Sequence, residues 1–214
     1  MKKLFLATAL LLTGFIAFAQ SAYEKVMTDK IGKIVQCKTN DDFTALSNDF
    51  SRIGDKEKSQ WLPYYYAALS AIQGGRVLMR DQKTDGLDVS GDAALNYISK
   101  AESLSPNNAE LFLLKKMAHG IKMMVDPMSR YMTEGQEAQK ALGEAIKLDP
   151  NNPRIYILQA EDLYFTPEQY GGDKKKAKET FLKAKELFKI NKPKTAIDPN
   201  WGESEADYFL SQMK

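Results

Sequence analysis

The sequence predicts an all-α protein of about four consecutive helix pairs, closed by a helix at its C-terminus. The first observation behind this prediction is a stripe of small and apolar residues, Ala138, Leu142 and Ala145, at a spacing that leaves one helix face for burial. The second is the turn that follows, where Pro150 ends one helix and Pro153 suits the first turn of the next. The third is the repetition of this pattern along the chain.

The pattern recurs at a nearly constant period. Small, large and small residues followed by proline stand 44 positions upstream of this stripe, and the first three positions recur 39 residues downstream. At three junctions, the last small or apolar residue of one helix precedes the aromatic residue of the next by 11 positions. These junctions run from Ile53 to Tyr64, from Ala101 to Phe112 and from Ala145 to Tyr156. Three matches in register predict an array of helical repeats.

The N-terminal segment is predicted to be a secretory signal peptide. Lys2 and Lys3 precede an apolar run that ends in a small-x-small cleavage site, and we expect cleavage after Ala19. The run is short for a membrane span, so the mature chain is expected to have none. The predicted destination is the bacterial periplasm, with secretion as the alternative. The predicted division is a signal peptide at 1–19, a repeat domain at 20–190, and an extended arm with a capping helix at 191–214.

The first half of the repeat domain contains three predicted helices. Residues 22–37 and 41–53 carry apolar residues at helical spacing and form a degenerate first pair, which lacks the terminal proline. The third helix opens near Trp61 with Pro63 in its first turn. Gly74 and Gly75 are expected to end or loosen this helix.

A long polar loop is predicted between residues 80 and 92. Asp81, Asp85 and Asp92 stand at positions 1, 5 and 12 of a weak calcium-loop pattern. However, Lys83 occupies a position that needs an oxygen ligand, and position 12 lacks the bidentate Glu. The sequence therefore favours a solvated loop over a calcium site.

The second half contains two insertions between predicted helices. The expected helices are 92–104, 111–121, 138–148, 155–164 and 174–190. The two insertions are 123–132 and 165–173. Asp173 is the predicted cap of the helix at 174–190. Residues 191–202 are predicted to form an extended arm that Trp201 packs down, and residues 203–213 a final helix that covers the last apolar face.

Residues 23 to 190 resemble the tetratricopeptide repeat, whose second helix carries small, large and small residues and then proline. The resemblance implies a right-handed α-solenoid of about four helix pairs with a C-terminal capping helix. It also implies that the first helix of each pair lines a concave groove. The positions carried over as groove residues are Tyr65, Leu69, Glu110, Leu113, Met117, Arg154, Ile157 and Glu161.

The predicted groove is largely apolar. The family's clamp for C-terminal carboxylates needs Lys and Asn at these positions, and this sequence lacks them. A groove bearing Tyr and Met is more similar to a site for an apolar helix or an extended peptide. The alternative is that the insertions or the chain's own C-terminal arm fill the groove. The stretches WLPYYYAA, YGGDKKKA and DPNWG also resemble exported repeat proteins of Gram-negative bacteria, which implies a location and a fold but no activity.

The residues indicate a protein that is not an enzyme and needs no cofactor. The chain has one His and one Cys, so no ordinary zinc site can be assembled, and Cys37 and His119 lie in different repeats. No phosphate-binding or dinucleotide-binding motif and no nucleophile elbow is present. Cleavage of the leader removes Lys2 and Lys3 and leaves equal numbers of basic and acidic residues, which gives no support for nucleic-acid binding.

A metal site is the one chemical alternative that the sequence raises. Met124, Met128 and Met132 are spaced four apart, near His119 and Met117, and thioether and imidazole ligands suit Cu(I). Met also fills irregular gaps in helical cores, which is the favoured interpretation here. The sequence therefore predicts a non-catalytic scaffold that binds a protein or peptide in the cell envelope. A protein that binds a small ligand or copper through the Met/His-rich region is the alternative, and no residue is assigned as a metal ligand.

Overall fold

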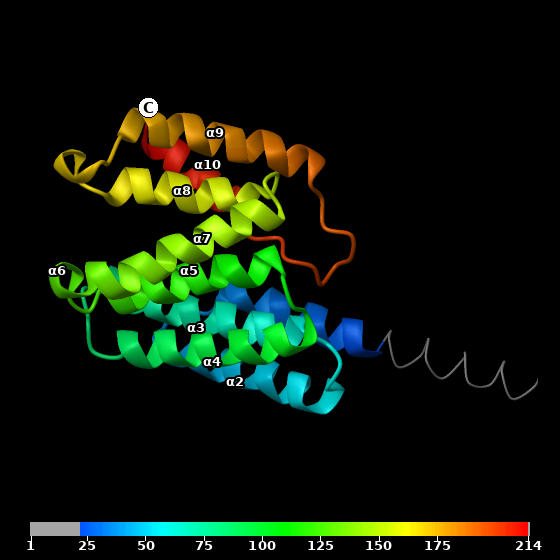
Figure 1. The fold of residues 1–214 in the computed structure, drawn as a ribbon. Helices are drawn as coiled ribbons and strands as arrows, with labels where there is room; N and C mark the ends of the chain where they lie inside the picture. Colours follow the sequence, from blue (N-terminus) through cyan, green and yellow to red (C-terminus); the bar gives the residue numbers. More distant parts are fainter. Residues whose placement is uncertain (1–21, 214) are drawn as a thin grey trace, which may run out of the picture.

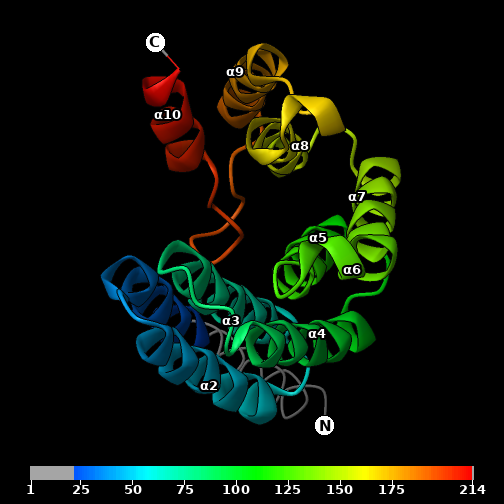
Figure 2. The same ribbon diagram turned by 90° about the vertical axis from the view of Figure 1, so that its left-hand side faces the viewer.

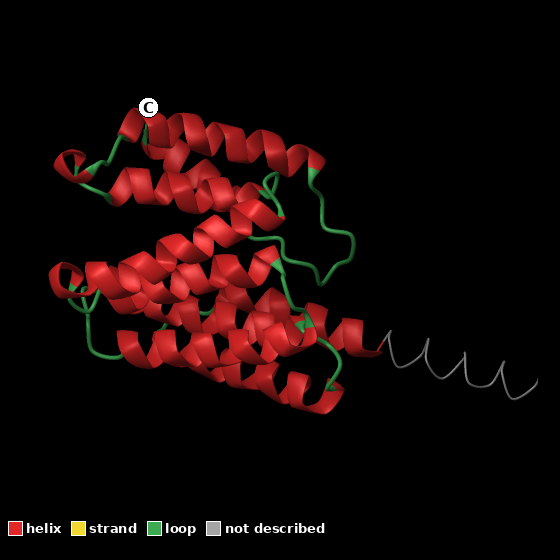
Figure 3. Cartoon of the chain, viewed as in Figure 1, coloured by secondary structure: helices red, strands yellow, loops and turns green. Residues whose placement is uncertain are grey.

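The structure, a computed structural model, describes residues 22–213. This part of the chain is helical and contains no strand (Figure 3). The predicted signal peptide lies outside the described residues. Among the helices that are described, none has the length and apolar character needed to span a membrane.

Most successive helices pack side by side in opposite directions, whereas α7 (Gln136–Leu148) and α8 (Pro153–Phe165) are in little contact with each other (Figure 1). A first helix covers residues 22–33 and ends in a single 3-10 turn at Ile34–Gln36. The helices that follow are α2 (Asn40–Glu57), α3 (Leu62–Arg80), α4 (Leu87–Leu104), α5 (Ala109–Met123), α6 (Pro127–Arg130), α7 (Gln136–Leu148), α8 (Pro153–Phe165), α9 (Lys174–Ile190) and α10 (Glu203–Gln212). A π turn at Tyr131–Gly135 joins α6 to α7, and a 3-10 turn at Glu168–Tyr170 precedes α9.

Side-chain caps explain where several helices begin. Thr39 accepts a hydrogen bond from the backbone N–H of Asp42, whose carboxylate in turn accepts from the backbone of Thr39. Asn152 caps α8 and Asp173 caps α9, as the sequence predicts. Because these bonds join residues two or three positions apart, the local sequence is sufficient to place them.

Two predicted boundaries are wrong. The helix α3 continues past Gly74 and Gly75 to Arg80, and both glycines are buried. A Cβ at Gly75 would lie 3.0 Å from the Ile121 side chain, so this glycine allows α3 and α5 to approach closely instead of ending a helix. The helix α4 begins at Leu87 instead of near residue 92, which shortens the predicted polar loop.

The calcium pattern is not used in this structure. Asp92, its last candidate ligand, lies within α4 and pairs with Lys122 of α5, whose Nζ is 2.7 Å from Asp92 Oδ1. Asp88, also in α4, binds Arg130 of the first insertion. These carboxylates therefore tie α4 to α5 and to the insertion.

The helices form two layers along an arc when the molecule is viewed end-on (Figure 2). The helices α3, α5 and α8 lie on the inner side of the arc, and α2, α4, α7 and α9 lie outside them. The arm at residues 191–202 crosses the inner side and leads into α10, which packs on α9.

The buried apolar residues divide into two clusters. The larger one runs from the first helix to α8 and includes Ile197 of the arm. The smaller one joins α8, α9 and α10 through Phe181, Phe188 and Ala206. Tyr156 and Trp201 pack against both clusters and so link the last helices to the rest of the array.

Candidate binding site on the inner face of the arc

A buried polar network joins the three inner helices. Tyr65 of α3 donates a hydrogen bond to Glu110 of α5, with 3.1 Å between Tyr65 Oη and Glu110 Oε2. Arg154 of α8 donates from Nε and Nη2 to the same carboxylate, at 2.6 to 2.9 Å. Asn152 adds a further bond at 2.6 Å. Hydrogen bonds from this many donors to one carboxylate hold α3, α5 and α8 together at one point.

The C-terminal arm is bonded directly to this network. Trp201 donates from Nε1 to Tyr65 Oη at 2.7 Å, and the Arg154 guanidinium carbon lies 5.8 Å from the centre of the Trp201 ring. Burial raises the pKa of Tyr65 well above its ordinary value of 10.0, so the phenol remains neutral and can both donate and accept.

Tyr66 supplies a second anchor for the arm. Its Oη lies 3.0 Å from the carbonyl oxygens of both Ile197 and Asp198. Burial is also the main cause that raises the pKa of Tyr66, which keeps the hydroxyl proton available for these carbonyls at neutral pH. The adjacent residues Tyr65 and Tyr66 thus bind the arm through two different contacts.

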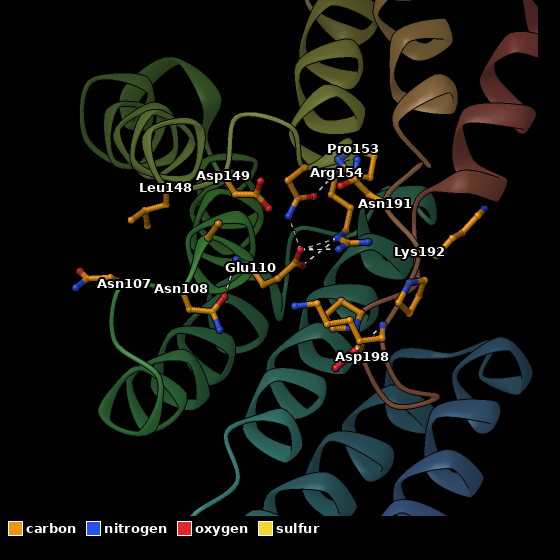
Figure 4. Close-up of a pocket in the computed structure, with 15 residues that line it drawn as sticks. Asn107, Asn108, Glu110, Leu148, Asp149, Pro153, Arg154, Asn191, Lys192 and Asp198 are labelled. Carbon is orange, nitrogen blue, oxygen red and sulfur yellow. Dashed lines mark hydrogen bonds and ion pairs between the residues drawn. The ribbon is translucent and has the colours of Figure 1, made fainter. Parts of the chain in front are cut away.

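A pocket of about 510 Å³ lies where the arm passes the first turns of α5 and α8 (Figure 4). Glu110 and Arg154 form part of its wall, together with Asn107, Asp149, Lys192, Lys194 and Asp198. Its acidic and basic side chains balance, and Glu110 and Arg154 already bind each other. This polar pocket therefore offers little attraction for an apolar or strongly charged ligand.

Arg76 bridges the inner face further along α3. Its Nη2 lies 2.7 Å from Glu161 Oε2 on α8, and its Nη1 lies 2.9 Å from Glu205 Oε1 on α10. This arginine therefore holds α10 across the inner side of the arc, in addition to the contacts made by the arm. Its guanidinium, with two carboxylate partners, is well satisfied where it stands.

The structure places all eight predicted groove residues on α3, α5 and α8 and covers them. Tyr65, Glu110 and Arg154 meet in the polar network, whereas Glu161 belongs to the Arg76 bridge. The apolar members are buried in the two core clusters: Leu69, Leu113 and Met117 in the larger, Ile157 in the smaller. The chain's own C-terminal segment contacts the inner face at Tyr65, Tyr66 and Arg76, in agreement with the alternative that the sequence left open.

Arg76, Tyr66, Asn152 and Glu205 take part in these contacts but were not among the predicted site residues. Arg76 stands 11 positions after Tyr65, about three turns along the same helix face, so extending the groove stripe would have reached it. Asn152 was predicted only as a helix cap, and it performs both roles. No sequence signal pairs Glu205 with Arg76, because they lie 129 positions apart.

The Met/His-rich region does not form one ligand set. His119 Nδ1 lies 2.6 Å from Glu134 Oε2, so its ring is paired with a carboxylate. Met117 is buried, whereas Met128 is 86 % exposed and Met132 72 % exposed. Within residues 22–213 there is also no group of three or more His, Cys, Asp or Glu side chains placed to hold a metal. The copper alternative therefore gains no support from this geometry.

Large apolar side chains are exposed on segments at one end of the molecule. The first insertion, with α6 and the π turn, and the second insertion, before α9, lie at the same end in Figure 1. Met128 and Met132 belong to the first insertion. Phe165, at the start of the second insertion, is 67 % exposed, and Tyr170 within it is 70 % exposed. Tyr208 of α10 is 61 % exposed. Exposed aromatic and thioether side chains of this kind are common at binding surfaces.

Comparison with known proteins gives a relative among the solved structures. No family profile matches the chain, and neither does any curated protein sequence. The chain is similar to the HusA haemophore from Porphyromonas gingivalis, with 33 % sequence identity and a TM-score of 0.77. The similarity covers 90 % of this chain and 92 % of the HusA chain. The chain therefore belongs to the same protein family as the HusA haemophore.

Proposed function

We propose that this protein is a non-catalytic ligand-binding protein that carries haem or a related porphyrin outside the cytoplasm. The observation that supports this most directly is the similarity to a haemophore at 33 % identity over nine-tenths of both chains. This degree of identity over nine-tenths of both chains supports a shared ligand class as well as a shared fold. A small flat ligand is therefore the first candidate, ahead of a peptide.

The surface chemistry is suited to such a ligand. Haem is a flat conjugated ring with two carboxylates on one edge, so it needs apolar side chains that stack on the ring and cations near the carboxylates. The exposed aromatic and methionine side chains at one end of the molecule supply the first requirement. The lysine-rich start of α9, next to these aromatics in the chain, supplies the second.

We also propose that the helix pairs form a right-handed solenoid of the tetratricopeptide type, with α10 as its cap. The inner position of α3, α5 and α8, each the first helix of a predicted pair, supports this proposal. The packing of α10 on α9 and the burial of Ala206 and Phe188 support a capping role. The predicted signal peptide and the haemophore relative both favour a periplasmic or extracellular location.

A protein or peptide partner is the second candidate. It is favoured by Met124 and Met128 in the first insertion, because flexible thioether side chains suit adaptable protein contacts. A haemophore also has to deliver its ligand to another molecule, so the two candidate functions are compatible.

Titration of the mature chain, residues 20–214, with haemin tests the first candidate. We expect a saturable shift of the haemin absorbance band and quenching of tryptophan fluorescence. Trp61 and Trp201 are the two tryptophans, and Trp61→Phe leaves Trp201 as the reporter in the arm. Absence of saturable binding at micromolar haemin would reject the haem proposal. Recovery of a specific envelope protein that is lost with Met124→Ala/Met128→Ala would then favour the second candidate.

A further inference from the structure

A partly exposed group of clustered rings lies at the junction of α8 and α10. We call this group the aromatic face: Tyr164 and Phe165 at the end of α8, and Tyr208 and Phe209 on α10. The centre of the Phe209 ring lies 5.1 Å from that of Tyr164 and 5.6 Å from that of Phe165. Phe165 and Tyr208 are 67 % and 61 % exposed, so the cluster presents ring surface to solvent.

The aromatic face has a rigid base. Phe209 stacks on Phe181 of α9, with ring centres 5.0 Å apart and an interplanar angle of 12°, and Phe181 is fully buried. The helix α10 is held on α9 by an ion pair between Lys185 and Asp207, and on α3 by the Arg76 bridge. Phe165 and Tyr208 both pack edge-on against Phe209, with ring centres 5.6 and 5.4 Å from its own. Rings supported in this way lose less conformational entropy than free side chains when a ligand stacks on them.

Positive charge lies beside these rings. Lys174 Nζ is 5.6 Å from the centre of the Tyr164 ring. Lys175 and Lys176 follow it in the first turn of α9. Among residues 22–213, Lys174 makes no ion pair with a carboxylate, which leaves its charge available for an anion. The combination of clustered, partly exposed rings and an adjacent ammonium group matches a flat aromatic ligand with carboxylates on its edge.

The other candidate surfaces of the described residues offer less. The predicted groove residues are buried in the core or paired with other side chains, and the pocket between the arm, α5 and α8 is polar and balanced in charge. The first insertion exposes methionines beside Arg130, but this arginine already binds Asp88 through both Nη1 and Nη2.

We propose that the aromatic face of α8 and α10 is the porphyrin site, where the ring stacks on Phe165 and Tyr208 and a carboxylate pairs with Lys174. This inference rests on the proposed haem-binding function and assigns it a location. It places the ligand on the rim formed by the C-terminal helices, outside the inner face that α3, α5 and α8 share with the arm.

Haemin titration of matched variants of the mature chain tests the location. We expect Phe165→Ala/Tyr208→Ala to weaken haemin binding about tenfold or more, since two stacking contacts are lost. Lys174→Glu is expected to weaken binding about threefold. Two controls match these changes: Val35→Ala/Ile190→Ala removes side chains that are 87 % and 76 % exposed, and Lys140→Glu reverses an exposed charge on α7. Both controls are expected to bind within about twofold of wild type.

The haemin titrations distinguish an error in the location of the site from an error in the haem-binding function. If wild-type protein binds haemin and Phe165→Ala/Tyr208→Ala binds equally well, the location is wrong while the function stands. Loss of binding in Met128→Ala/Met132→Ala, with the aromatic variant unaffected, would move the site to the first insertion. If wild-type protein fails to bind haemin, both proposals fail. Circular dichroism of each variant checks that the fold is retained, which we expect because the altered side chains are exposed.

Discussion

At the scale of single residues, Glu110 is the central group of the inner face. It is a largely buried carboxylate that accepts from Tyr65, Asn152 and Arg154. A buried ion pair contributes little compared with an apolar pair of the same shape, but removing one partner leaves an uncompensated charge. Removal of a single partner of Glu110 is therefore expected to lower the free energy of unfolding.

We predict that Arg154→Ala lowers the free energy of unfolding by about 3 kcal/mol, because it leaves Glu110 buried without its cation. Urea denaturation measures this change. The control is Lys147→Ala on α7, which breaks the exposed pair with Glu144 and should change stability by less than about 0.5 kcal/mol. Equal effects of the two substitutions would show that burial of the Glu110 network does not matter for stability.

Asp88 gives a second prediction at this scale. Its hydrogen bonds to Arg130 hold the pKa of the Asp88 carboxyl below its ordinary value of 3.8. Because the pKa of Asp88 is lower in the folded protein, its interaction with Arg130 stabilises the fold at pH values above the pKa that this carboxyl has in the unfolded chain. This stabilisation is lost as the pH falls through the pKa of Asp88 in the folded protein. We expect Arg130→Met to raise the pKa of Asp88 toward its ordinary value, measured by carboxyl NMR titration.

Asp42 is the internal control for that titration. Backbone hydrogen bonds from Lys38 and Thr39 lower its pKa, and neither involves Arg130. The Asp42 pKa should therefore stay the same in Arg130→Met. An unchanged Asp88 pKa in this variant would contradict the assignment of Arg130 as its main partner.

At the scale of elements, the C-terminal arm decides whether the inner face is accessible. Its hydrogen bonds to α3 join the Tyr66 hydroxyl to two backbone carbonyls and Trp201 to Tyr65. The arm enters α10 through Gly202, which has φ of 106° and would place a Cβ 3.0 Å from the Phe188 ring. Glycine is therefore required at this bend both for its conformation and for space.

We predict that Tyr66→Phe loosens the arm without unfolding the array. The loss of one shared hydrogen bond costs about 1 kcal/mol, which corresponds to about a fivefold rise in local opening. Trypsin cleavage after Lys194 and deuterium exchange of residues 191–202 measure this opening. The matched control is Tyr97→Phe, whose exposed hydroxyl makes only a long contact of 3.4 Å with Asn48. If both variants are cleaved at the same rate, the Tyr66 contacts do not hold the arm.

At the scale of the whole molecule, ligand binding should appear as added stability. A ligand that binds only the folded chain, at a free concentration 100 times its dissociation constant, adds about 2.7 kcal/mol to the free energy of unfolding. For a chain of this length we expect haemin to raise the unfolding midpoint by about 5 to 10 °C in calorimetry. The variant Phe165→Ala/Tyr208→Ala should show a smaller rise at the same haemin concentration, whereas Val35→Ala/Ile190→Ala should match wild type.

Local features of the fold could be predicted from the sequence alone. The helical character, the caps at Asn152 and Asp173, and the order of helices, insertions, arm and final helix depend on residues a few positions apart. The sequence also indicated that the first helices of the predicted pairs would share a face. Its errors came at Gly74, Gly75 and the start of α4, where tertiary packing outweighed local propensity.

Only the tertiary structure decided what covers the inner face. Tyr66 contacts the Ile197 carbonyl across 131 positions and Arg76 contacts Glu205 across 129, so no local pattern could pair them. The same applies to the aromatic face, because Phe165 and Phe209 come together only when α10 packs on α9. Spacing along a helix determines which side chains share its surface, whereas the return path of the arm determines which of those surfaces remain open to a ligand.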